Sequence, residues 1–483
     1  MISEPVAIGV LGLLAPGPVV LTQARVTWTF ERRLLGAAVL AWAIVATMNL
    51  LAGGALGHDE AAFAIIARGD GQDWLYRSRG VVELARLGVA LGGADWQLRI
   101  ASAILGLGVV LAVYAVGRAA FGARTGAWAA AVIAGAHPMA ARSAELLGDL
   151  PATAGMLAGL AVLAGELGRP GGPRWRIALA APAFAAAFYL RYGTGPVIAI
   201  AALAALVLWW RTILARPLPV LAAAAVFAGL LVPHARHSLG ETGDVLGVLR
   251  WAAGTPRLAY PGEGLVTYLT ANPFMYYGAL VAPLMIAALV GLARTLRSRP
   301  PWLLASVALG QLLAIGIESH AQPRYVFIAV ALLVVLGVET VRSLARPRIA
   351  LALVAAAWLG IAIGTIPYDR AIARSRGTIT AAAAAIRADH EAGHRARPCM
   401  VIAELVTQLM WYSRCQGTRL DTIEPSTLAP DRDRYAVSTP YTPLDGAAFA
   451  AAYGVTLAEL PTGYARARVW ALQPPQAGSP SGR

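Results

Sequence analysis

Long apolar runs fill most of the chain, and short polar loops separate them. An apolar helix needs about 20 residues to cross about 30 Å of hydrocarbon. Runs that approach this length lie near residues 34–56, 97–119, 124–141, 148–167, 175–190, 193–210, 217–235, 273–293, 300–317, 323–341 and 347–366. The run at 175–190 is short, and only Arg191-Tyr192-Gly193 separates it from the next. The pattern predicts an α-helical polytopic membrane protein with about eleven transmembrane helices.

After residue 366, turn residues, charges and short apolar stretches replace the long runs. We expect a small soluble α/β domain over residues 367–472. In it, 398–406 forms a strand that leads into a helix through Trp411, and 465–472 forms a late strand. The tail 473–483 is rich in Pro, Gly and Ser, which favours disorder. The transmembrane domain then spans residues 31–366.

The first 30 residues belong to neither domain. Their apolar stretch, 6–21, is interrupted by Pro16 and Pro18 and has no basic residue ahead of it, so it is a poor signal peptide. A disordered or functional segment and a mis-assigned start codon are both open interpretations.

Composition supports a membrane protein. Charged residues make up 14% of the chain and hydrophobic residues 58%, whereas a soluble domain has about 25% charged residues. The net charge is +14, and all 40 cationic residues are Arg, placed singly or in small groups between apolar blocks. There is no basic stripe or stacking platform for nucleic acid, so we expect no nucleic-acid partner.

The Arg residues are better explained as an orientation signal. They are more numerous in the loops on the N-terminal side, which makes that side cytoplasmic. With an odd number of spans, the C-terminal domain lies outside the cytoplasm, at the inner (plasma) membrane. Acidic residues gather in the outer loops, and because they hardly affect orientation, their clustering indicates chemistry at that face.

The first outer loop begins with His58, Asp59 and Glu60. A carboxylate at this surface can act as a general base on an acceptor hydroxyl. The plainer interpretation is an acidic pair that caps a short helix.

A second acidic loop, 142–151, contains Arg142, Glu145 and Asp149. Asp149 can likewise be a helix cap, with Pro151 two positions later. Two acidic loops on one face are harder to explain as two independent caps, which favours a shared function.

The order of these motifs resembles the membrane glycosyltransferases of the GT-C type, specifically the protein O-mannosyltransferase and lipid A aminoarabinose transferase family. In that family an Asp-Glu pair is followed by a Tyr, by a basic residue ahead of Gly or Pro, and by a Leu-Arg that opens the second span. An Arg-plus-Asp-Pro loop and a His/Arg-Tyr motif come later. The corresponding residues here are Asp59-Glu60, Tyr76, Arg79-Gly80, Leu98-Arg99, Arg142 to Pro151 with Leu150 inserted, and His320 to Tyr325.

The resemblance covers roughly residues 30–345, and it has departures. The basic residue of the first loop is commonly Lys in the family and is Arg79 here, and the Lys-Pro-Pro signature of that loop is absent.

The resemblance implies an inverting transfer of a sugar from a polyprenyl-phosphate donor to an acceptor hydroxyl, with Asp59 as the general base. A phosphate leaving group needs positive charge, which Arg can offer as a bidentate fork. The catalytic candidates are Asp59, Glu60 and Asp149. The phosphate-binding candidates are Arg79, Arg191, His320 and Arg324. Secondary candidates are His58, Arg142, Glu145 and Tyr325.

Several of these residues have simpler interpretations. Arg324 can be a side chain that snorkels at the end of a span, and Arg191 can pair with a loop acid. Tyr325 can be an anchor in the aromatic belt.

The expected partners are the polyprenyl-phosphate-linked sugar, a lipid, glycan or protein acceptor, and membrane lipids. The acids and His58 can hold a divalent metal, but the resemblance to metal-independent relatives favours no metal and no other cofactor.

The alternative function is that of a transporter or flippase of a lipid-linked glycan precursor, which predicts charges in the middle of spans and internal repeats. A third possibility, a non-catalytic scaffold, would leave the two acidic loops unexplained.

Cys399 and Cys415 are the two cysteines of the chain, and both lie in the C-terminal domain. An oxidising compartment favours a disulfide between them. Two buried free thiols are the alternative, because their spacing does not by itself bring the Cα atoms within bridging distance.

Overall fold

The structure is a computed structural model. It describes residues 18–473 except for 53, 71–73, 75–76, 255–258, 297, 343–345, 394–396, 405, 424–431, 441–442 and 465. Residues 1–17, most of the expected tail and Tyr76 therefore lie outside the described residues.

Eight helical segments in the described part of the chain are long and apolar enough to cross a membrane. These are Phe30–Ala52 within α1 (Pro18–Ala52), α4 (Asp95–Phe121), α7 (Asp149–Leu167), Tyr192–Ala215 comprising η2 (Tyr192–Thr194) and α9 (Gly195–Ala215), α10 (Pro217–Thr242), α16 (Arg299–Glu318), Pro323–Arg342 comprising η3 (Pro323–Val326) and α17 (Phe327–Arg342), and Pro347–Gly364 within α18 (Pro347–Gly393). The polytopic helical fold expected from the sequence is confirmed.

Three of the expected spans fold as shorter helices. The run at 124–141 becomes α5 (Ala123–Ala134) and the single turn α6 (His137–Ala140). The run at 175–190 becomes η1 (Trp175–Leu179) and α8 (Ala180–Leu190), and the run at 273–293 is divided among α13 (Pro273–Tyr277), α14 (Val281–Val290) and α15 (Leu292–Thr295). The exact number of spans stays a prediction.

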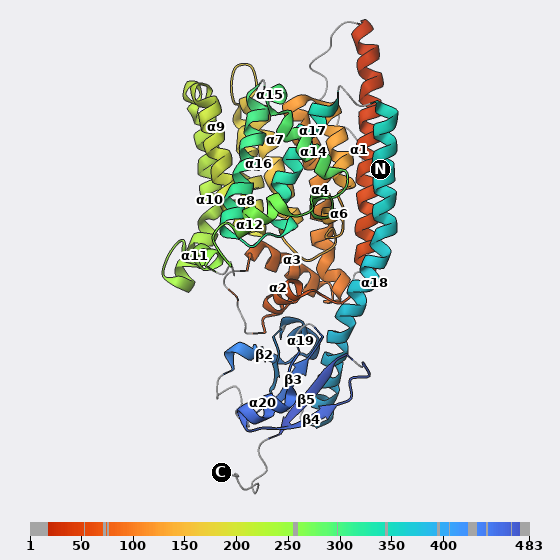
Figure 1. Ribbon diagram of the computed structural model, residues 1–483. Helices are drawn as coiled ribbons and strands as arrows, with labels where there is room; N and C mark the ends of the chain where they lie inside the picture. Colours follow the sequence, from red (N-terminus) through yellow and green to blue (C-terminus); the bar gives the residue numbers. More distant parts are fainter. Residues whose placement is uncertain are drawn as a thin grey trace, which may run out of the picture.

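In the loops, the described residues form four further helices: α2 (His58–Arg68), α3 (Arg79–Ala90), α11 (Gly247–Ala253) and α12 (Glu263–Thr270). Helices α2 and α3 form a layer between the membrane bundle and the C-terminal sheet domain (Figure 1). The first acidic loop therefore lies at the end of the bundle that faces this domain, and the second lies beside it, because the backbone N–H of Leu146 donates to Glu60 of α2 at 2.9 Å.

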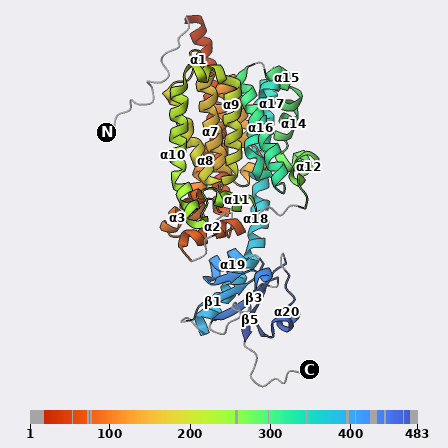
Figure 2. The same ribbon diagram turned by 90° about the vertical axis from the view of Figure 1, so that its left-hand side faces the viewer.

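Helix α17 is at the centre of the bundle. Every residue from Phe327 to Val338 is buried, which explains why this segment is apolar all round rather than amphipathic. By contrast, α10 stands at the edge of the bundle in Figure 2, and only 6% of its apolar window is buried. The remaining apolar side chains of α10 therefore face the lipid in a membrane.

The C-terminal domain contains a five-stranded sheet in the order β2-β1-β3-β5-β4. Strand β1 (Cys399–Ile402) is parallel to β2 (Gln416–Thr418) and β3 (Asp433–Ser438), whereas β5 (Arg468–Gln473) is antiparallel to β3 and to β4 (Thr456–Leu460). The helices are α19 (Val406–Ser413), η4 (Leu420–Thr422) and α20 (Gly446–Tyr453). Helix α18 runs without a break from the bundle into this domain (Figures 1 and 2). The strand, the helix through Trp411 and the late strand are all present.

Cys399 and Cys415 form a disulfide with a Cα–Cα distance of 4.8 Å. Cys399 opens β1 and Cys415 follows the end of α19, so the bridge closes the β1–α19 segment. We expect replacement of both cysteines by Ala to destabilise the C-terminal domain by about 3 kcal/mol, because the unfolded chain loses its cross-link. The measurement compares the unfolding midpoint of the double variant with that of the wild type, and that of the wild type with and without reductant. The bridge would be contradicted if reductant left the unfolding midpoint of the wild type unchanged and if both thiols were alkylated without prior reduction.

Candidate active site

Helix α2 carries the first acidic pair at its N-terminus. The backbone N–H of Gly57 donates to Glu60 Oε2 at 2.7 Å, which fixes the first turn. The Asp59 side chain keeps 30% of its surface exposed, whereas that of Glu60 keeps 2%. Asp59 can therefore meet a substrate, and Glu60 faces the protein interior.

Two arginines from distant parts of the chain hold Asp59. Arg77 Nη1 donates to Asp59 Oδ1 at 2.8 Å, and Arg324 Nη2 donates to Oδ2 at 3.1 Å. Burial would raise the pKa of Asp59, but the positive charges of Arg77 and Arg324 outweigh it and hold that pKa well below its usual range. Asp59 is therefore ionised at neutral pH. As long as both arginines bind it, however, it is a weak base.

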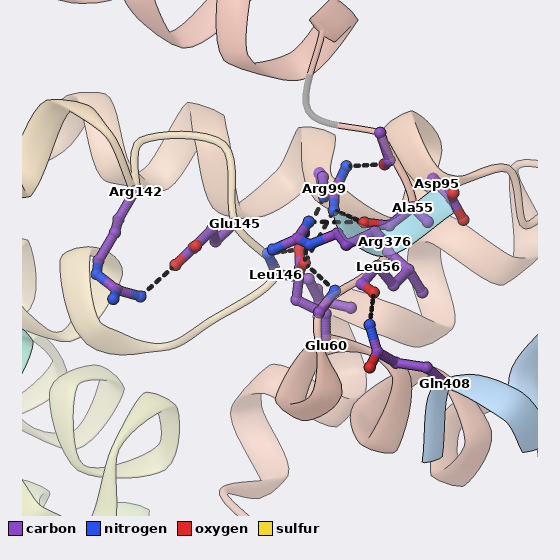
Figure 3. Close-up of polar contacts among 12 residues, drawn as sticks. Ala55, Leu56, Glu60, Asp95, Arg99, Arg142, Glu145, Leu146, Arg376 and Gln408 are labelled. Atoms are coloured by element: carbon purple, nitrogen blue, oxygen red, sulfur yellow. Dashed lines mark hydrogen bonds and ion pairs between the residues drawn. The ribbon is translucent and has the colours of Figure 1, made fainter. Parts of the chain in front are cut away.

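Glu60 is the centre of a buried network (Figure 3). Arg99 donates to both of its oxygens, with Nε 2.7 Å from Oε1 and Nη2 2.8 Å from Oε2. The backbone N–H of Leu146 adds a third contact at 2.9 Å, and Arg376 Nη1 lies 3.5 Å from Oε2. These contacts tie α2 to α4, to the second acidic loop and to α18, which indicates a positioning role for Glu60.

A second Asp–Arg pair lies at the ends of two helices of the bundle. Asp149, at the start of α7, forms an ion pair with Arg191 at the end of α8. Gly148 explains this approach, because a Cβ at that position would overlap the carbonyl oxygen of Leu190.

The aromatic ring of Tyr325 connects the two Asp–Arg pairs. The guanidinium carbon of Arg191 lies 4.6 Å from the ring centroid and that of Arg324 lies 5.5 Å from it. Both distances are in the range of cation–π contacts. Asp149, Arg191, Arg324 and Tyr325 line one small pocket together with Gln311. Two guanidinium groups thus line this pocket, each paired with a carboxylate, and the partly exposed Asp59 lies beside it because it pairs with Arg324.

His320 lies close to this pocket. Its ring is 5.7 Å from that of Tyr325, and its Nε2 lies 2.8 Å from the side-chain nitrogen of Gln322. The other ring nitrogen, Nδ1, has no hydrogen-bond partner among the described residues.

Arg79 points elsewhere. Its Nε donates to Nε2 of His237 in α10 at 3.2 Å, and its backbone N–H donates to the hydroxyl of Tyr192 at 3.3 Å. The basic side chain of the first loop that contacts Asp59 is Arg77, two residues earlier.

The secondary candidates have other partners. Arg142 and Glu145 form an ion pair at 2.7 Å, and burial raises the pKa of Glu145 despite this partner. His58 Nδ1 lies 2.9 Å from the hydroxyl of Thr407 in the C-terminal domain. In the part of the chain that the structure describes, no three His, Cys, Asp or Glu side chains gather as a metal site.

Sequence reasoning did not assign a role to Arg77, Arg99 or Arg376. One signal was available for Arg99: it belongs to the Leu-Arg motif that opens the second span, and a charged residue at the start of an apolar span is costly to bury unless it has an acidic partner. Arg77 and Arg376 have no comparable signal in the sequence.

Part of the chain matches a known protein family. Residues 82–237 match the family described as dolichyl-phosphate-mannose-protein mannosyltransferase. No curated protein sequence matches the chain.

Solved structures of similar fold extend the comparison to almost the whole chain. The structure of ArnT from Cupriavidus metallidurans bound to undecaprenyl phosphate is similar with a TM-score of 0.66 at 15% identity, covering 92% of this chain and 98% of that one. The apo form of the same protein is similar with a TM-score of 0.62 at 15% identity, covering 93% of this chain and 98% of that one. An oligosaccharyltransferase from Archaeoglobus fulgidus in complex with zinc and sulfate is similar with a TM-score of 0.52 at 16% identity, covering 80% of this chain and 62% of that one. The chain therefore has the fold of the GT-C-type membrane glycosyltransferases, as its motifs predicted.

Proposed function

We propose that the protein is a membrane glycosyltransferase that moves a sugar from a polyprenyl-phosphate donor to an acceptor hydroxyl, with inversion at the sugar carbon. The observation that carries the proposal is the partly exposed Asp59, bound by Arg77 and Arg324 beside a pocket that also contains Arg191. The fold of ArnT, whose structure holds undecaprenyl phosphate, supports a donor of this kind.

The two arginines on Asp59 suggest how binding and catalysis are linked. A donor phosphate competes with the Asp59 carboxylate for Arg77 and Arg324, since guanidinium groups pair with both anions. When an arginine moves to the phosphate, the pKa of Asp59 rises and the carboxylate becomes a better base. Asp59 is thus activated when the donor is bound.

The transfer step follows from these positions. Asp59 takes the proton of the acceptor hydroxyl while the acceptor oxygen attacks the anomeric carbon from the side opposite the phosphate. The bond between that carbon and the phosphate oxygen breaks, and the electron pair leaves with the polyprenyl phosphate. Arg324, Arg191 and Arg77 stabilise the negative charge that develops there, and His320 can add an N–H donor. Asp149 orients Arg191, and Glu60 orients α2.

We place this chemistry at the outer face of the inner membrane, with residues 31–366 as the transferase domain and residues 367–472 as an extracytoplasmic domain. The Arg-rich loops on the opposite side support this orientation.

The test uses the full-length protein in lipid vesicles with a panel of labelled undecaprenyl-phosphate-linked hexoses and pentoses. We expect label to pass from one of these donors to an acceptor in an added membrane extract. Mass spectrometry of glycans and glycolipids from a deletion strain should then identify the missing product. Label that crosses the bilayer while it stays on its carrier would contradict the proposal and indicate a flippase.

Arg324→Ala should weaken binding of undecaprenyl phosphate by about 10–100-fold, because a hydrogen bond to a charged group contributes about 1.5–3 kcal/mol. Titration of the purified variant with this lipid measures the effect. Arg250→Ala is the matched control, since Arg250 pairs with Asp244 on the surface and keeps 71% of its side chain exposed. Equal affinities of wild type and the Arg324 variant would remove Arg324 from the phosphate site.

A further inference from the structure

The C-terminal domain contacts the helix that carries Asp59 through α19. Val406, Met410 and Trp411 of α19 pack into the same apolar cluster as Leu56, just ahead of α2, and Phe63, within α2. Arg68, at the end of α2, also lies over the Trp411 ring at 4.3 Å and donates to its backbone carbonyl at 3.3 Å. The two helices are thus joined along their length, although about 350 residues separate them in the chain.

Polar side chains of α19 bind the backbone just ahead of Asp59. The Tyr412 hydroxyl accepts from the backbone N–H of Leu56 at 2.6 Å. The Gln408 amide donates to the carbonyl of Leu56 at 2.6 Å (Figure 3). The Thr407 hydroxyl donates to the carbonyl of His58 at 2.9 Å. Both polar groups of Leu56 are therefore held by side chains of another domain.

The same contacts connect to the bundle. The Tyr412 hydroxyl donates to Asp95 Oδ2, at the start of α4, at 2.7 Å. On the other side, Arg99 donates to the carbonyls of Gly54 and Ala55 at 2.8 and 3.1 Å. The segment 54–58 is thus held between the bundle and α19, and Asp59 follows it directly.

We propose that Thr407, Gln408 and Tyr412 are positioning residues for Asp59, so that the C-terminal domain sets the geometry of the proposed base. The disulfide between Cys399 and Cys415 closes the segment that contains α19. It therefore restrains the position of these three side chains. A shift of about 1 Å at a catalytic group can cost about 100-fold in rate. The kinetic consequence rests on the proposed function, whereas the physical contact does not.

The first test is hydrogen–deuterium exchange on the full-length protein with Thr407→Val and Tyr412→Phe combined. We expect the amides of residues 54–63 to exchange about tenfold faster, because the N–H of Leu56 loses its partner and the first turn of α2 is released. Tyr453→Phe is the control, since Tyr453 lies on α20 and contacts Phe449. Unchanged exchange in residues 54–63 would overturn the proposal.

The second test is kinetic and uses the labelled donor found in the vesicle assay. The double variant should lose about 10–100-fold in kcat with little change in the KM for donor, because the base moves while the phosphate pocket stays intact. Thr407→Ser, which keeps the hydroxyl, should retain kcat close to wild type. An unchanged kcat in the double variant would overturn the role in catalysis. If the wild type transfers no sugar, the proposed function fails, and hydrogen exchange alone decides whether α19 positions α2.

Discussion

Asp59→Asn should abolish most turnover while the protein folds normally and still binds the lipid donor. The amide nearly preserves the shape of the carboxylate but cannot take the proton of an acceptor hydroxyl. Removal of a general base costs about 10²–10⁴-fold in rate. The measurement is kcat with the labelled donor, with the elution profile of the purified variant as a check on folding. A variant that retains a tenth or more of wild-type turnover would disprove the assignment of Asp59 as the base.

The same variant tests the exchange of arginines between carboxylate and phosphate. In the wild type, Arg77 and Arg324 bind the charged Asp59, and the donor phosphate has to displace it. Without the charge of Asp59, both arginines are more available, so undecaprenyl phosphate should bind at least as tightly as to the wild type. A large loss of affinity in Asp59→Asn would instead show that the carboxylate itself helps to hold the donor.

Local patterns explain what could be predicted from the sequence. The spans depend on the length of apolar runs, which a window of about 20 residues captures. The place of the acidic loops directly beside the apolar runs can also be read from neighbouring residues, and it identified Asp59 and Asp149 as candidates. The runs at 124–141, 175–190 and 273–293 fold as shorter helices, so the length of an apolar run does not by itself fix the length of the helix that forms.

Pairing between distant residues could not be predicted in this way. Arg324 contacts Asp59 across 265 positions, and only the packing of the spans brings them together. The choice between Arg77 and Arg79 depends on which way each side chain turns where α3 begins, and no local rule decides it. The contacts between Leu56 and α19 likewise arise from the docking of two domains.

Glu60 also shows the difference between a prediction from neighbouring residues and the contacts that the fold creates. Its place beside Asp59 suggested a catalytic group, yet its partners are Arg99, Arg376 and two backbone amides. Burial would raise the pKa of Glu60, but the charge of Arg99 outweighs it and keeps that pKa below its usual range. An ionised carboxylate with this many donors has little capacity left for a substrate proton.

Glu60→Gln should therefore destabilise the protein strongly. The neutral amide leaves Arg99 buried without its counter-charge, and breaking a buried ion pair in this way costs about 3–5 kcal/mol. Glu83→Gln is the matched control, because Glu83 pairs with Arg86 on the surface with 59% of its side chain exposed, and such pairs contribute at most about 1 kcal/mol. The unfolding midpoints of the two purified variants in the same detergent provide the measurement. If Glu60→Gln unfolds like the Glu83 variant but loses turnover as Asp59→Asn does, Glu60 acts on the substrate rather than on the position of α2.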